Sequence, residues 1–134
     1  MLTGLLHAHS GLRYLVLLAG VAALFYALVG LLTNRPYDRG MRATAATFAG
    51  LLHLQVLLGL ALVAFGIWYP QLIGHIVLMV LAAVAAQVPL SLVKRRPPEE
   101  RSHTPHLVGT VLALVLIWAG ILAIGRGLLE AGFV

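Results

Sequence analysis

Four long apolar segments constrain this chain more than any other feature of its sequence. They lie near residues 10–33, 43–68, 71–93 and 106–128. Each reaches the length of about 20 residues that a helix needs to cross a bilayer core. The segments take up most of the 134 residues. We therefore expect an all-α membrane protein in which residues 1–134 form a single domain, a bundle of four transmembrane helices.

The composition points to the same class of protein. Hydrophobic residues make up 61% of the chain and charged residues only 10%. A soluble domain of this size has too little interior to bury so much apolar surface, so the lipid bilayer is the expected surroundings. The sequence contains no cysteine. Disulfides, thiolate metal sites, iron–sulfur clusters and covalently attached c-type haem are therefore excluded.

The basic residues gather in two short loops, 34–42 and 94–103. These loops hold three and four Lys or Arg residues, which makes seven of the nine in the chain. Charge placed in this way sets membrane topology, so we expect no nucleic-acid partner despite the net charge of +5. Two helices separate the loops, which puts both on one side. The positive-inside rule predicts that this side is cytoplasmic, with both termini on the outer (periplasmic) side of the cell inner membrane.

Small residues recur at helical spacing and predict which helix faces approach one another. In the first segment the stripe consists of Gly20, Ala23, Ala27 and Gly30. Its extension toward the N-terminus contains His9, while His75 and His106 begin comparable stripes in the third and fourth segments. These three histidines are therefore expected to face the inside of the bundle.

His9 and His75 are the strongest candidates for a cofactor site. Both lie near the outer end of their helices, and two neutral imidazoles from different helices at one depth are the usual ligands of a b-type haem. Arg13 follows His9 by four residues, on the same helical face, where it can bind a propionate. Arg126 returns to the same side of the membrane. His7, on the other face of the first helix, remains an alternative ligand.

Other polar residues suggest further contacts. His53 lies near the middle of the second segment, level with Gln87 when the helices are aligned at 1.5 Å per residue. We predict that His53 has a polar partner inside the bundle, either Gln87 or a ligand, since a bare imidazole in hydrocarbon is costly. With Gln55 it could instead bind a quinone carbonyl or a second cofactor.

Two further histidines, His103 and His106, flank Pro105 beside the second basic loop. Their position at the end of a span predicts interfacial residues at the inner membrane surface.

Three short motifs resemble a known family. "LHAHSGLRYLVLL" at 6–18, "HLQVLLGL" at 53–60 and "HIVLMVLAA" at 75–83 are similar to small four-helix bacterial membrane proteins labelled cytochrome b. The resemblance implies a haem-associated or respiratory-chain role. A more distant similarity is to the membrane anchors of succinate dehydrogenases, which use few helices, haem b and quinone.

Two functions follow as hypotheses. The first is a small membrane redox protein with haem b, exchanging electrons with quinone, in which His9 and His75 bind iron. The second is a non-catalytic accessory subunit of a larger membrane complex, respiratory or photosynthetic, or a homo-oligomer, with glycine-rich faces as docking surfaces. A transporter ranks below both, since no acidic residue lies within a predicted helix to relay protons or bind cations.

Overall fold

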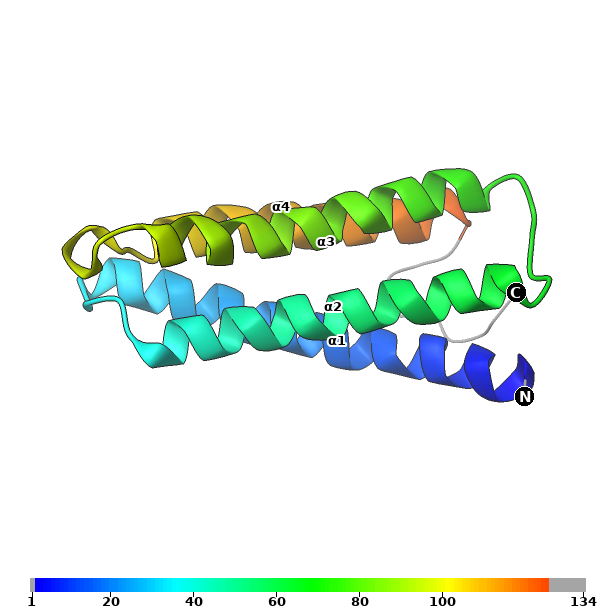
Figure 1. Cartoon of the computed structure of the whole chain (residues 1–134), viewed down its shortest axis with the longest axis horizontal. Helices are drawn as coiled ribbons and strands as arrows, with labels where there is room; N and C mark the ends of the chain where they lie inside the picture. Colours follow the sequence, from blue (N-terminus) through cyan, green and yellow to red (C-terminus); the bar gives the residue numbers. More distant parts are fainter. Residues whose placement is uncertain (1, 126–134) are drawn as a thin grey trace.

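The computed structural model of the protein describes residues 2–125, and four long helices make up most of this range (Figure 1). They are α1 (Leu2–Leu32), α2 (Arg39–Ala64), α3 (Leu72–Arg95) and α4 (Thr104–Ala123), with a short 3₁₀ helix η1 (Pro98–Glu100) before α4. Each of the four is long and apolar enough to cross a membrane. By length and composition this is a multi-pass membrane protein with an all-helical fold, as the sequence predicts.

The helix ends differ from the predicted segments for local reasons. α1 begins at Leu2, well before residue 10, so His7 and His9 lie within a helix. α2 ends at Ala64, four residues early, because the chain turns at Gly66, whose φ of +106° suits glycine. The predicted continuation of the fourth segment beyond residue 125 lies outside the described residues.

Asp38 fixes the start of α2. Its carboxylate accepts a hydrogen bond of 3.0 Å from the backbone N–H of Met41 and is the N-cap of the helix. It also accepts hydrogen bonds of 2.8 Å from the hydroxyl of Tyr26 on α1. The Met41 N–H and the Tyr26 hydroxyl hold the pKa of Asp38 below its usual value. The cap thus joins the first two helices at the end of the bundle that carries the basic loops.

The helices form an antiparallel bundle in which neighbours in sequence are neighbours in space. α1 packs most closely on α2, and α3 on α4, while α2 with α3 and α1 with α4 complete the ring. α1 and α3 therefore face one another diagonally across the interior. In Figure 1 the α1–α2 pair and the α3–α4 pair diverge toward the end where α1 begins.

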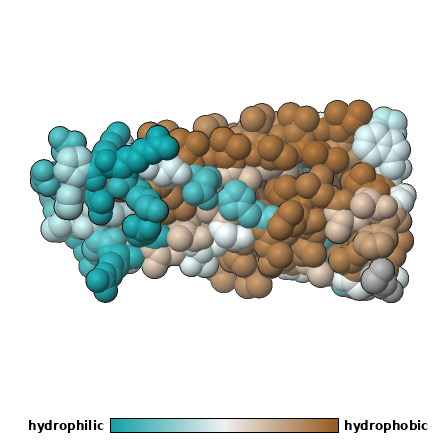
Figure 2. Space-filling view, in the orientation of Figure 1, coloured by the Kyte–Doolittle hydropathy of each residue, from teal (hydrophilic) through white to brown (hydrophobic). Residues whose placement is uncertain are grey.

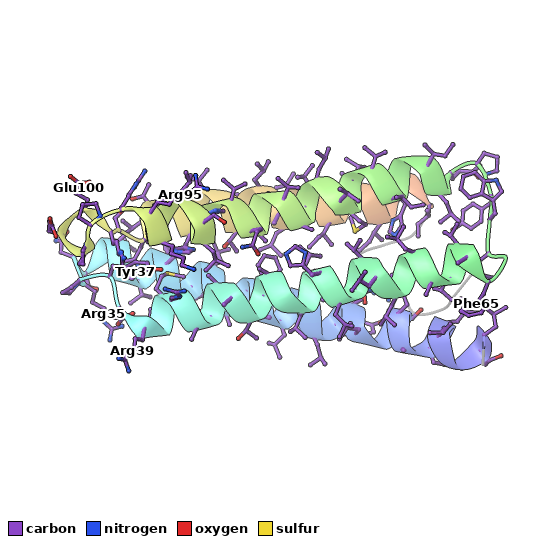
Figure 3. All side chains as sticks on the ribbon, viewed as in Figure 1. Arg35, Tyr37, Arg39, Phe65, Arg95 and Glu100 are labelled. Atoms are coloured by element: carbon purple, nitrogen blue, oxygen red, sulfur yellow. The ribbon has the colours of Figure 1, made fainter. Side chains whose placement is uncertain are left out.

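The two ends of the bundle differ in polarity. Figure 3 places Arg35, Arg39, Arg95 and Glu100 at one end and Phe65 at the other. Figure 2 shows the same division, with hydrophilic residues at the basic end and hydrophobic residues over most of the remaining face. Both basic loops thus lie at one end, while α1 begins and α4 ends at the opposite end.

Small residues bring the helices together as their spacing predicts. Gly20, Ala23, Ala27 and Gly30 are all buried on α1. α3 and α4 come close together at Gly109, where an added Cβ would lie 2.6 Å from the carbonyl oxygen of Ala85. Pro89, four residues after Ala85, cannot donate to that carbonyl, so the oxygen is turned toward α4.

We expect Gly109→Val to destabilise the bundle by about 1–3 kcal/mol, because the new side chain must push α4 away from α3. The measurement is unfolding by sodium dodecyl sulfate, followed by circular dichroism. The matched control is Gly11→Ala, a glycine in α1 with no atom within 4 Å of an added Cβ. This change should leave stability equal or raise it by up to about 1 kcal/mol. Equal stability of the Gly109→Val variant and the unaltered protein would contradict the packing described.

Candidate functional site

A cavity of about 130 Å³ opens between the two helix pairs, at the end of the bundle away from the basic loops. Its wall is mostly aliphatic, with polar side chains from three helices and one loop. These are His9, Ser10 and Arg13 from α1, Gln55 from α2, Tyr69 from the loop before α3, and His75 from α3. The site predicted from His9, His75 and Arg13 thus corresponds to one concave surface.

His75 is held in one orientation by a neighbouring helix. Its Nδ1 donates a hydrogen bond of 2.8 Å to the backbone carbonyl of Gly120 on α4. That bond requires a proton on Nδ1, which in the neutral imidazole leaves the Nε2 lone pair available. Metal-binding histidines in proteins are commonly oriented by this type of bond. Glycine suits position 120 because an added Cβ would collide with the end of the Met79 side chain and lie 3.7 Å from Nδ1 of His75.

His9 and His75 line the same cavity from diagonally opposite helices. The His9 ring lies against α2 at Gly59, where an added Cβ would be 3.1 Å from its Cε1 atom. Its Nδ1 is buried and makes no hydrogen bond with any residue in the described range 2–125. An unpaired polar atom beside a cavity indicates a place where a ligand or water can bind.

Gln55 supports the His9 segment of α1. Its Nε2 donates a hydrogen bond of 2.7 Å to the backbone carbonyl of His9. The amide orientation is fixed by this bond, since the reverse would bring two oxygens together. The side-chain Oε1 of Gln55 is then buried without a donor among the described residues. The cavity therefore presents an acceptor at Gln55, a ring nitrogen at His9 and a ring nitrogen at His75.

The size of the cavity bears on its occupant. A cavity of roughly 150 Å³ holds one benzene ring, so 130 Å³ provides room for a single ring. The donor set, two imidazoles and an arginine, fits a b-type haem. The macrocycle is wider than one ring, so it would require the α1–α2 and α3–α4 pairs to separate further at the end where they already diverge.

The other predicted cofactor residues are distributed unevenly around this cavity. Arg13 contributes to the wall and also contacts Tyr14, through a 2.9 Å hydrogen bond and a cation–π contact of 4.8 Å. His7 is exposed on the outer face of α1, together with Gly11, Tyr14 and other residues of its stripe. The face of α1 that meets the cavity is therefore the one with His9. Arg126 lies outside the described residues.

His53 lies elsewhere. Its Nε2 is 3.1 Å from Oε1 of Gln87, so the predicted partner is confirmed. The predicted location is wrong, because both side chains are exposed on the outer surface between α2 and α3. His53 is about 160° around the helix from Gln55, which faces the core, since each residue turns the helix by about 100°. It therefore does not share the cavity with Gln55.

A second polar cluster occupies the basic end of the bundle. His103 and His106 are only 2% and 1% exposed. His106 therefore faces the inside of the bundle, as its small-residue stripe predicts, and neither side chain lies on the outer surface of the basic end. Tyr37, from the loop between α1 and α2, covers them. Its hydroxyl is 2.9 Å from Nε2 of His106, and its ring stacks on that imidazole with centroids 5.5 Å apart. Burial raises the pKa of Tyr37, which keeps its hydroxyl protonated.

His103 fills the space left by a glycine. Its ring lies over Gly30 of α1, where an added Cβ would be 2.7 Å from Nε2. The rings of Tyr26 and Tyr37 flank it at centroid distances of 6.2 and 5.8 Å. Neither ring nitrogen has a hydrogen-bond partner within residues 2–125. The His103 ring is thus packed tightly among aromatic rings and helps to close the bundle at the basic end.

Comparison of the chain with protein-family models, with curated proteins and with solved structures finds no match. Within the described range, no group of three or more His, Asp or Glu side chains is arranged to hold a metal ion. The site must therefore be interpreted from its own chemistry.

Sequence reasoning missed three parts of this cavity. The carbonyl of Gly120 orients His75, Gly59 makes room for the His9 ring, and Gln55 binds the backbone of His9. Gly120 belongs to the small-residue stripe that begins at His106, so the spacing does indicate that this glycine faces a neighbouring helix. Nothing in the spacing distinguishes Gln55, which faces the interior, from its neighbour His53, which faces outward.

Replacing Tyr37 by phenylalanine should destabilise the protein by about 1–3 kcal/mol, because Nε2 of the buried His106 loses its partner. Unfolding of detergent-solubilised protein, followed by circular dichroism, measures the effect. Tyr14→Phe is the matched control, since the Tyr14 side chain is 41% exposed. A loss of stability as large for Tyr14→Phe as for Tyr37→Phe would contradict the role given to the buried pair.

Proposed function

We propose that this protein is a small integral membrane redox protein that holds a b-type haem between His9 and His75. The observation that carries the proposal is the shared cavity, to which diagonal helices contribute one imidazole each near the same end of the bundle. Haem b bound by two imidazoles supplies one-electron transfer. Electron exchange with a quinone is the corresponding reaction in the membrane.

The surrounding residues have definite tasks under this proposal. The Gly120 carbonyl keeps the proton of His75 on Nδ1, which directs the other nitrogen toward a ligand. Gln55 holds the backbone of α1 at His9, and Gly59 leaves space for the ring. Arg13 is the cation for a propionate. The aliphatic wall excludes water, which strengthens these polar contacts.

A second candidate occupant is a single-ring quinone or quinol. Two observations favour it: the cavity volume suits one ring, and Oε1 of Gln55 lacks a donor among the described residues. A quinol hydroxyl would supply that donor, while His9 or Arg13 would contact the oxygen at the other side of the ring. Under this alternative the protein is a quinone-binding subunit, and the accessory role in a larger membrane complex becomes its main function.

The haem proposal is tested by replacing each histidine with alanine. We expect His9→Ala and His75→Ala to reduce haem content to near background, because a coordinate bond is lost that packing cannot restore. The measurement is the reduced-minus-oxidised spectrum of each purified variant, normalised to protein, after expression with added haem.

Two variants serve as matched controls for this test. His7→Ala removes a histidine from the exposed face of the same helix, and His53→Ala removes the one bonded to Gln87 on the outer surface. Both should retain haem. Loss of haem in the His7→Ala variant alone would move the ligand to the other face of α1. Full retention in the His75→Ala variant would refute the site.

We also propose the orientation of the bundle. The two basic loops, 34–42 and 94–103, face the cytoplasm, and both termini face the periplasm across the inner membrane. The support is the distribution of Lys and Arg, since two basic loops at one end satisfy the positive-inside rule. The cavity then lies in the outer half of the membrane.

Single cysteines report this orientation cleanly because the chain has none of its own. We expect a membrane-impermeant maleimide to label Thr3→Cys in intact cells, and to label Glu99→Cys only after the cells are lysed. Both positions are exposed, so burial does not limit the reaction. Labelling of Glu99→Cys but not of Thr3→Cys in intact cells would reverse the proposed topology.

A further inference from the structure

We propose that two copies of this chain associate in the membrane through the outer seam between α2 and α3. We define the α2/α3 seam by its exposed residues Ala46, Gly50 and His53 on α2, and Val84, Gln87 and Ser91 on α3. Figure 2 shows hydrophilic residues extending from the basic end into the middle of this face. The proposal goes beyond the redox function and does not depend on it.

The exposed His53–Gln87 pair is the observation that indicates a second protein surface over the seam. Both side chains are exposed on a surface that a lipid-facing helix normally fills with aliphatic residues. Each uses one hydrogen-bonding group on the other, over 3.1 Å. Within residues 2–125, the second ring nitrogen of His53 and the second amide group of Gln87 make no hydrogen bond. Unsatisfied polar groups in hydrocarbon are costly, so a protein surface is expected to cover them.

The unused groups are complementary to a second copy of themselves. If Nε2 of His53 donates to Gln87, the pair retains a free acceptor at His53 and a free N–H donor at Gln87. If the tautomer and the amide are both reversed, the free donor is at His53 and the free acceptor is at Gln87. In either arrangement the pair offers one donor and one acceptor at the same depth.

The membrane places the complementary groups of two copies at the same depth. Two copies inserted with the same orientation are related by a two-fold axis along the membrane normal, so each residue meets residues of the other copy at its own depth. The His53–Gln87 pair of one copy then faces the same pair of the other, and two intermolecular hydrogen bonds close a ring of four side chains. A helix of unrelated sequence would need its own polar group at this depth.

Small side chains allow the close approach that these bonds need. An added Cβ at Gly50, one turn from His53, would have no atom within 4 Å. Ala46 is exposed one further turn along the same face of α2. Small residues at helical spacing, combined with a polar side chain, are typical of helix–helix interfaces in membranes. The seam thus has both the contact surface and the polar contacts of a symmetric dimer.

Cysteine cross-linking in native membranes tests the proposal. Gly50→Cys should form a covalent dimer of twice the chain mass when treated with a flexible bis-maleimide, because the two Gly50 positions lie on either side of the two-fold axis, too far apart for a direct disulfide. The matched control is Val108→Cys on α4, which lies diagonally across from α2. Val108 is 60% exposed, so burial does not prevent its reaction. It lies at about the depth of Gln87, because its neighbour Gly109 contacts Ala85 and Pro89, which flank Gln87 in the sequence. This variant should give no dimer.

A second substitution tests the hydrogen bonds themselves. Adding His53→Leu to Gly50→Cys should lower the cross-linked fraction about tenfold, since each interhelical bond in a membrane is worth roughly 3- to 20-fold in association. Adding His7→Leu should leave the fraction unchanged. The proposal is overturned if Gly50→Cys yields no dimer, if Val108→Cys cross-links equally, or if the product has the mass of a different partner. An undiminished yield with His53→Leu also overturns it.

Discussion

The bilayer core offers no hydrogen bonds, and this constraint explains where the polar residues of the protein lie. An imidazole or amide within a span is therefore costly unless it bonds to another helix or to a ligand. His75 finds the Gly120 carbonyl, Gln55 finds the His9 carbonyl, and His53 finds Gln87. These bonds each connect a different pair of helices, so they fix the rotation of the helices about their axes as well as the separation between them.

The small residues make those bonds possible. A helix can offer a backbone carbonyl to a side chain of its neighbour only where the two backbones come close. Gly120 allows this for His75, and Gly109 does the same for the contact with Ala85 and Pro89. The loose end of the bundle, beside His9 and Gly59, is where such contacts give way to a cavity. Tight packing at the basic end, with His103 over Gly30, closes the bundle there.

The sequence was sufficient for the features that depend on length and spacing. Four spans, the buried stripe from Gly20 to Gly30 and the pairing of His53 with Gln87 all follow from helix geometry. Features that depend on how a helix is rotated, or on a loop that folds back, did not follow. His53 and Gln55 are two residues apart and face opposite ways, and Tyr37 buries His106 from a distant segment. Periodicity within one helix carries no information on either point.

The cavity and the α2/α3 seam occupy different parts of the molecule. The cavity lies between the diagonal helices α1 and α3, while the α2/α3 seam faces outward. The seam residues lie within 46–53 and 84–91, whereas the cavity lies at the end of the bundle away from the basic loops. In a symmetric dimer through the seam, each copy would hold its cofactor independently, and the distance between the two sites would be set by the bundle width, about the diameter of two packed helices.

Titration of the purified, unaltered protein with haem tests the central claim most directly. The account predicts that the Soret absorbance rises to a break at one haem per chain. The spectrum of the product should be that of a low-spin haem with two imidazole ligands, as His9 and His75 would give. A titration without a break, or a high-spin product with a single histidine ligand, would contradict the account of this cavity.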